Sequence, residues 1–365
     1  MGTWQTARTW VSGETVTATI MNGHVRDQLD ALYDWRNGAG RRNVLTNSHM
    51  DIWQVGTTIA VPSTTKTYLC DMWAVFRPAT GCTVSRQTGP TGQAYTQRVQ
   101  RDSGNASTGV IQIIQAIETL DSYQLAGQTC QLKLVLRSGA NFSAASSNVL
   151  VKVTWGTGVD QDPTASWTGT TDALSILRAI TATATEYTFD AISIPANATQ
   201  VKVDISFTPV GTAGANDWFE LSAAQLTAGE TPTIERLPTS QTQIECQRHF
   251  VKLGPIPGGA TAYAFADGSV QTSSAADFTI RLPVEMRAKP TVTVSAVNDF
   301  TILAAGVQHS TTGMTLAGLG NDGDHTTDSI AIRGSLGAAM TAGHGAKLTN
   351  NQDKTNGAIF ISARL

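Results

Sequence analysis

The chain has few charged residues. Asp, Glu, Lys and Arg make up 15% of its 365 residues, against about 25% in ordinary soluble domains. The formal net charge is −3, so the chain lacks the basic excess with which proteins bind nucleic acid or an anionic membrane surface. We therefore expect no nucleic-acid partner.

Long apolar runs are also absent. No stretch approaches the roughly 18–20 apolar residues of a membrane-spanning helix, so we expect no membrane insertion. The segment Met1–Thr6 lacks the basic and apolar regions of a secretory signal. The sequence thus favours synthesis in a cytosol, with release by lysis or as part of a particle.

Cysteine is scarce and lacks a C-x-x-C pair. The four residues are Cys70, Cys82, Cys130 and Cys246. In a chain of this length they cannot form a disulfide scaffold. We expect buried free thiols that pack as small apolar side chains, with a Cys70–Cys82 disulfide as the alternative.

Motifs for catalysis, metal binding and cofactors are missing as well. There is no Gly-x-Ser-x-Gly elbow, no His-Glu-x-x-His and no phosphate-binding glycine loop. The segment Asn321–His325 lacks the terminal Glu of an EF-hand. A glycosidase needs two carboxylates about 5–10 Å apart, and the scattered acids do not define such a pair. We expect no enzyme activity, no cofactor and no metal.

The sequence does contain many short segments with β patterning. Between residues 44 and 237, alternating apolar and polar residues recur between loops rich in Gly, Asn, Pro and Ser. This frequency predicts an antiparallel sandwich or jelly roll with one wetted face on each sheet. Trp53, Trp73 and Trp218 lie within such patterns, and we assign them to the core.

The tryptophans also indicate how the chain divides. All eight lie within the first 218 residues, which favours at least two separate cores. We expect an N-terminal docking segment (1–43), a jelly roll (44–237), a linker (238–250) and a second β domain (251–365). Gly, Asn, Asp and Thr are frequent between residues 311 and 356, which predicts long loops. The fold class is mainly β.

One amphipathic helix is predicted in the N-terminal segment. Val25, Leu29 and Leu32 fall on one helical face. Because a helix of about 12 residues is not stable alone in water, this stripe must contact the body of the protein, a neighbouring copy or a docking protein.

Four segments, taken in order, resemble one protein class. They are Trp10–Leu29, Asn47–Thr58 with its Asp-Ile-Trp-Gln motif, Glu245–Phe250 and Phe278–Pro290. Together they resemble tail fibre and receptor-binding proteins of tailed bacteriophages, which carry a carbohydrate-binding-module-like jelly roll. The resemblance covers most of the chain.

The resemblance implies a homotrimer on a virion, made in the host cytoplasm. Such a protein attaches to other tail or capsid proteins through residues 1–43 and binds a bacterial surface glycan. A head fibre or capsid decoration protein is an alternative with the same modules. A secreted bacterial carbohydrate-binding protein is another, although the missing signal peptide counts against it.

The predicted sugar site lies in the jelly roll. Trp155 and Trp167 bracket an acidic loop that contains Asp160 and Asp162. Exposed indoles would stack on pyranose rings while the carboxylates accept hydrogen bonds from sugar hydroxyls. The other interpretation is that both indoles pack in the core or at its rim.

Overall fold

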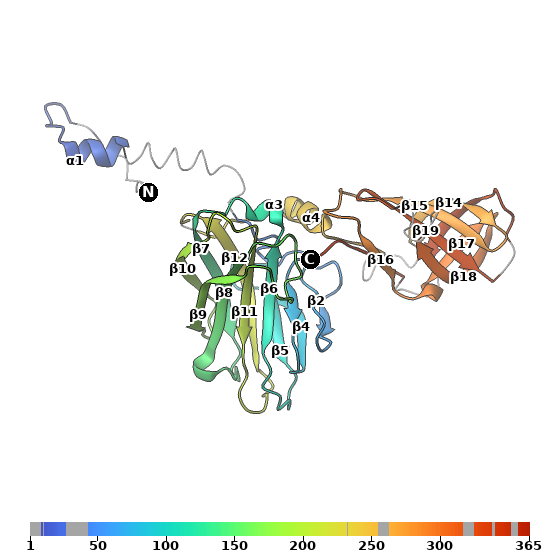
Figure 1. Cartoon of the computed structure of the whole chain (residues 1–365), viewed down its shortest axis with the longest axis horizontal. Coiled ribbons are helices and arrows are strands. Elements are labelled where there is room, and N and C mark those ends of the chain that lie inside the picture. The colour runs from blue at the N-terminus through green and yellow to red at the C-terminus, as the bar shows by residue number, and fades with distance from the viewer. Residues whose placement is uncertain are drawn as a thin grey trace.

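The chain folds into antiparallel β-sheets. A computed structural model describes residues 9, 11–26, 43–231, 233–254, 263–316, 325–337, 340–351 and 357–365. Strands account for 46% of the structure and helices for 9%. Figure 1 shows a sandwich joined to a second, C-terminal unit. The predicted fold class is therefore confirmed.

Two six-stranded sheets form the sandwich. In spatial order, the first contains β1 (Thr58–Ala60), β4 (Cys82–Thr88), β5 (Tyr95–Arg101), β12 (Trp218–Ala228), β7 (Thr129–Ser138) and β10 (Thr185–Ser193). The second contains β2 (Thr67–Tyr68), β3 (Ala74–Phe76), β6 (Ile111–Ile117), β11 (Gln200–Phe207), β8 (Asn148–Gly156) and β9 (Thr171–Ala179). We call them the β12 sheet and the β11 sheet.

The sandwich core follows from the period-2 alternation of its strands. In β11, Val201, Val203 and Ile205 are fully buried, whereas Lys202 and Asp204 lie on the outer face between them. Burying one such aliphatic side chain contributes roughly 1.5–3 kcal/mol. Apolar side chains of β12 and β7 join the same cluster, so the two sheets enclose one continuous core.

The structure shows where the three tryptophans assigned to the core and the four cysteines lie. Trp73 is fully buried and Trp53 packs against the core, as predicted. The assignment of Trp218 to the core is wrong: it is half-buried and shares a strand with the fully buried Phe219, its neighbour on the opposite face. All four cysteines are buried and free, which confirms the prediction of free thiols.

The C-terminal unit consists of a closed barrel and a small sheet. The barrel order is β14 (Ala264–Thr272), β15 (Ala275–Arg281), β19 (Ser329–Leu336), β18 (Val307–Leu316), β17 (Phe300–Ala304) and β20 (Gly345–Asn350). The three-stranded sheet has β21 (Ile359–Ser362) between β13 (Phe250–Leu253) and β16 (Thr291–Val294). Both share one apolar core.

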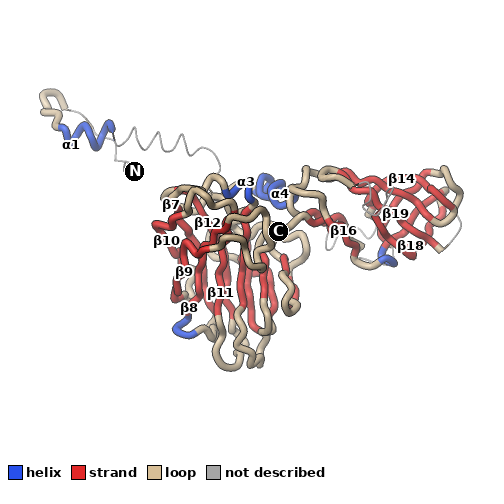
Figure 2. Tube along the Cα trace, in the orientation of Figure 1, coloured by secondary structure: helices blue, strands red, loops and turns tan. Residues whose placement is uncertain are grey.

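Helices are short and lie outside the sheets, as Figure 2 shows. Within the stretch 238–250, expected as a linker, Thr239–Gln247 forms α4. The helix α3 (Thr119–Ser122) follows β6 directly. None of the helices in the described parts of the chain is long and apolar enough to span a membrane.

The N-terminal segment carries α1 (Ala18–Met21), which a π-helical turn over Asn22–Arg26 continues. Neither element contains a buried residue. Val25 is 38% exposed, and Leu29 and Leu32 lie outside the described residues. The docking role of this stripe stays a prediction.

Candidate functional site

The predicted sugar-binding tryptophans lie on opposite faces of the β11 sheet. Trp155 is the cross-strand partner of the buried Val201 and packs against the sandwich core. Trp167 lies over the outer face, since a Cβ on Gly156 would approach its Cε3 atom to 3.3 Å. The two indoles therefore cannot form one stacking platform.

Trp167 is buried, so the interpretation that requires an exposed indole does not hold for it. Only 5% of the residue is exposed, because it packs with Ala116 and Leu365. Its Nε1 donates to the carbonyl oxygen of Asp162 at 2.9 Å. The Nζ atom of Lys202 lies 4.5 Å from the ring centroid.

The two predicted acids hold contacts within the protein. Asp160 accepts a hydrogen bond from the amide of Thr119 at 2.8 Å and pairs with Arg287 of the C-terminal unit at 2.8 Å. Asp162 pairs with Lys66. Burial opposes ionisation of Asp162, but hydrogen bonds from Lys66 and Thr164 hold its pKa below the usual value.

These contacts place the loop 157–168 at the seam between the sandwich and the C-terminal unit. Lys66 also donates to the carbonyl oxygen of Leu365 at 2.6 Å. The loop thus helps to fix the last residues of the chain against the sandwich. A sugar-binding role for Trp155, Asp160, Asp162 and Trp167 stays a prediction.

A second candidate lies on the outer face of the β12 sheet. We call it the Trp218 recess, and it consists of Arg98, Gln100, Arg137, Trp218 and Glu220. Three adjacent strands, β5, β12 and β7, supply these side chains. Glu220 is the cross-strand partner of both Arg98 and Arg137, so the three side chains form one row across the sheet.

Glu220 fixes both arginines. Its side chain is fully buried, whereas those of Arg98 and Arg137 are 21% and 26% exposed. Oε1 accepts from Nε and Nη2 of Arg98 at 2.8 and 2.6 Å, and Oε2 accepts from Nε of Arg137. Because hydrogen bonds between ionised groups are short and directional, both guanidinium groups are held in one orientation.

Trp218 lies beside this row. The guanidinium carbon of Arg98 is 3.9 Å from a Trp218 ring centroid, and that of Arg137 is 5.8 Å away. A Cβ on Gly139 would lie 2.7 Å from the Cε2 and Nε1 atoms of the indole. Glycine at this position therefore gives the ring the room it occupies.

The β12 sheet curls around this face. Arg137 lies on β7, and β12 and β5 separate it from β4. Three strand spacings amount to about 14 Å in a flat sheet, which exceeds the reach of an arginine side chain. Nevertheless, Nη2 of Arg137 is 3.5 Å from the carbonyl oxygen of Thr88 at the end of β4. The end of β4 therefore bends towards β7 on this side of the sheet.

The outer face of the β11 sheet has balanced charge. Lys152 pairs with Asp172 at 2.7 Å, and Lys202 lies beside Asp204 on β11. Burial raises the pKa of Asp204 to about 6, while the charge of Lys202 partly opposes that effect. Two lysines and two aspartates leave no net charge on this face.

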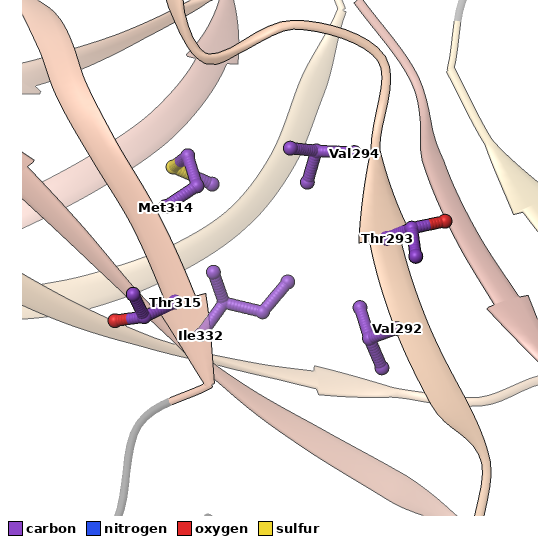
Figure 3. A pocket seen from close by; sticks show the side chains of 6 residues that line it. All are labelled: Val292, Thr293, Val294, Met314, Thr315 and Ile332. Carbon is purple, nitrogen blue, oxygen red and sulfur yellow. The ribbon is translucent and has the colours of Figure 1, made fainter.

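The C-terminal unit contains a further candidate, a small gap between β16 and the barrel. Val292 and Val294 of β16 face Met314 and Ile332 of the barrel across a gap of about 100 Å³, with two threonines at its margin (Figure 3). The volume is below the roughly 300–1,000 Å³ of sites that enclose small ligands. Its lining contains no charged group. The recess, in contrast, joins an aromatic ring to two arginines that one buried carboxylate holds in place.

The described parts of the chain contain no group of three or more His, Cys, Asp or Glu placed to bind a metal. The strand context of Trp218 predicts a core position, so the sequence alone does not reveal the recess. A signal that Trp218 faces outward is nevertheless present in Trp218–Phe219–Glu220–Leu221. In a strand, Trp218 shares its face with the charged Glu220 and not with the apolar Phe219.

Comparisons with known proteins give weak similarity. No protein-family model matches the chain, and no curated protein matches it either. A CBM4 structure is 16% identical with a TM-score of 0.32 and covers 50% of this chain and 98% of its own. The C-terminal family 22 carbohydrate-binding module of Clostridium thermocellum Xyn10B is 17% identical with a TM-score of 0.28, over 44% and 89%.

A virion protein is among the similar structures. The enzymatically active domain of tailspike protein 4 from bacteriophage CBA120 is 10% identical, with a TM-score of 0.33. The match covers 51% of this chain and 21% of that structure. At such low similarity, a function must be inferred from the residues of the site.

Proposed function

We propose that the chain is an adhesion protein of a tailed-phage particle and that it binds a glycan of the bacterial surface through the Trp218 recess. The observation that supports this proposal most directly is that Trp218 lies beside two arginines, which one buried carboxylate holds in place. The sequence resemblance to receptor-binding proteins supports the biological setting.

The chemistry of the recess suits a sugar. A pyranose ring has apolar faces and a rim of hydroxyl groups, so it binds an aromatic ring flanked by hydrogen-bonding groups. Trp218 supplies the ring, and Arg98 and Arg137 supply donors. Because the guanidinium groups are already fixed, little side-chain entropy is lost when a ligand binds.

We propose binding without catalysis. Glycoside hydrolysis uses two carboxyl groups on either side of the scissile bond. Within the recess, Glu220 is the one acid among the residues that form it, and both of its oxygens accept from arginine. A carboxylate held in this way lacks the second carboxyl group that glycoside hydrolysis needs.

The N-terminal segment supports the proposed homotrimer and the attachment to other virion proteins. Val16, Met21 and Val25 are 49%, 45% and 38% exposed. Such apolar side chains on a short helical segment, or just before it in the case of Val16, favour contact with further copies or with a docking protein. In a trimer, three recesses would raise the effective concentration of binding sites and convert weak contacts into avidity.

The binding proposal is tested with purified full-length protein and host cells. Trp218→Ala is expected to weaken cell-surface binding about tenfold or more, as for a central aromatic anchor, whereas Trp218→Phe retains most of it. Lys152→Gln, on the opposite sheet, is the matched control and is expected to bind like the wild type. Equal binding by Trp218→Ala and the wild type would contradict the proposal.

The assembly proposal has its own measurement. Light scattering is expected to give the mass of a trimer, and Val25→Asp is expected to lower that mass, since a buried charge opposes an apolar contact. A stable monomer of the wild type at micromolar concentration would rule the trimer out. Absence of product from any glycan after prolonged incubation is expected if the chain only binds.

A further inference from the structure

We infer that the glycan bound in the Trp218 recess is acidic and that its carboxylate or phosphate group contacts Arg98 and Arg137. This inference rests on the proposed function, since it specifies the ligand of the same site. Its basis is the charge of the recess and the direction of the arginine donors.

The recess has an excess positive charge. Arg98 and Arg137 contribute two positive charges, and the buried Glu220 contributes one negative charge. The charges of Lys133 and Glu186 leave this excess unchanged, because the two side chains pair with each other. Lys133 pairs with Glu186 at 3.0 Å on the same sheet.

A second ion pair near the recess also has no net charge. Arg236 binds Asp51 at 2.9 Å. The opposite face of the sandwich, with two lysines and two aspartates, has no excess either. Of these surfaces, the recess is the one that would attract an anion.

Donors remain for that anion. Arg98 binds Glu220 through Nε and Nη2, so its Nη1 group has no hydrogen-bond partner within the described chain. Arg137 uses Nε for Glu220, and its Nη2 makes only the long contact with Thr88. A guanidinium group presents its donors in a fixed fork that matches carboxylate and phosphate oxygens.

Preorganisation strengthens this preference. An arginine that is free in solution must lose side-chain entropy when it binds an anion. Here Glu220 and the ring of Trp218 have already fixed Arg98. Partial burial also lowers the local dielectric constant, so a new charge-assisted hydrogen bond is stronger than at an open surface. A neutral sugar would also benefit from the fixed orientation of the arginines, but it would not gain the attraction between opposite charges.

The test uses pairs of oligosaccharides that are identical except for one acidic group. One member is neutral, and the other carries either a carboxylate or a phosphate group, so that the two sources of negative charge are separated. Calorimetry with the full-length protein is expected to give at least about tenfold tighter binding of an acidic member. This preference is expected to shrink when NaCl rises from about 0.05 M to about 0.5 M.

Variants identify the groups responsible. Arg98→Gln and Arg137→Gln are expected to reduce the acidic preference to about threefold or less, because they weaken binding of the acidic member more than binding of the neutral member. Either variant leaves Glu220 with one fewer partner, so its folding is checked by thermal unfolding. The salt dependence of the wild type needs no variant and keeps the inference testable if these proteins do not fold. Arg281→Gln in the barrel is the matched charge control.

The outcomes separate this inference from the proposed function. Equal binding of neutral and acidic members, independent of salt, would overturn the acidic ligand and leave glycan adhesion in place. Binding of host cells but of no oligosaccharide, before and after removal of cell-surface glycans, would overturn both. An acidic preference that survives Arg98→Gln and Arg137→Gln in folded protein would place the anion elsewhere and refute the assignment of this site.

Discussion

The substitution Glu118→Gln is expected to weaken the junction between the sandwich and the C-terminal unit. Glu118 lies between β6 and α3 and is 5% exposed. Its Oε2 is 2.8 Å from Nη2 of Arg248, and its Oε1 is 2.9 Å from Nε2 of His249. Both partners lie between α4 and β13, so one buried carboxylate connects the two units.

The magnitude follows from the pKa of the carboxyl group. Burial alone would raise this pKa, but hydrogen bonds and charges from His249 and Arg248 hold it at about 2 instead of 4.5. Each tenfold change in proton affinity corresponds to about 1.4 kcal/mol. Because the side chain of Arg248 is 42% exposed and its charge is screened, we expect roughly 2–3 kcal/mol from these contacts.

The direction of the pKa shift of Glu118 determines how the stability depends on pH. A carboxyl group whose pKa is lowered by folding stabilises the folded state above the pKa of the unfolded chain, near 4.5. This stabilisation is lost as the pH falls from 4.5 towards about 2. Glu118→Gln is expected to lack this loss and to be less stable than the wild type at pH 7.

Scanning calorimetry provides the measurement. At pH 7, Glu118→Gln is expected to unfold in two separated transitions, or to lose roughly 2–3 kcal/mol of unfolding free energy if the transition stays single. Asp328→Asn removes an exposed ion pair with Arg281 and is the control, expected to unfold like the wild type. Identical unfolding of Glu118→Gln and the wild type at pH 7 would refute the reasoning.

Three further expectations concern other parts of the molecule. Gly139→Ala should displace both the backbone at Asn216 and the indole of Trp218, because the added Cβ would lie 2.1 Å from the Asn216 carbonyl oxygen and 2.7 Å from the indole; tryptophan fluorescence should shift and glycan binding should fall about tenfold, and an unchanged spectrum would contradict the packing. Asp204→Asn should stabilise the sandwich by about 1–2 kcal/mol at pH 7 but not at pH 3. Burial raises the pKa of Asp204 from 3.8 to about 6, so ionisation of this side chain at neutral pH disfavours the folded state. Urea unfolding at both pH values is the check. Reducing agent should leave the melting temperature unchanged, since all four cysteines are free; a drop on reduction would reveal a disulfide.

The sequence was sufficient to predict the β architecture because one physical rule dominates it. Alternation such as Val201, Val203 and Ile205 against Lys202 and Asp204 defines an inner and an outer face of a strand. The thiol prediction succeeded for a related reason: spacing gave no disulfide pattern, and small apolar side chains pack into a core.

The binding face could not be predicted with the same success, because it depends on contacts between distant strands. Trp218 was placed in the core from its strand context alone. Its neighbours in the recess come from β5 and β7, and the pairing of Glu220 with Arg98 and Arg137 is a matter of register. Likewise, Asp160 lies in a loop that suggests a ligand, yet its partner Arg287 is distant in sequence.

The position of β21 has a consequence for biosynthesis. This strand lies between β13 and β16 in its sheet, so neither neighbour has its hydrogen-bonding partner until residues 359–362 have left the ribosome. The sandwich strands, by contrast, are complete once Ala228 has been translated. We therefore expect the sandwich to fold during translation, whereas the C-terminal unit folds only after β21 has been inserted between β13 and β16.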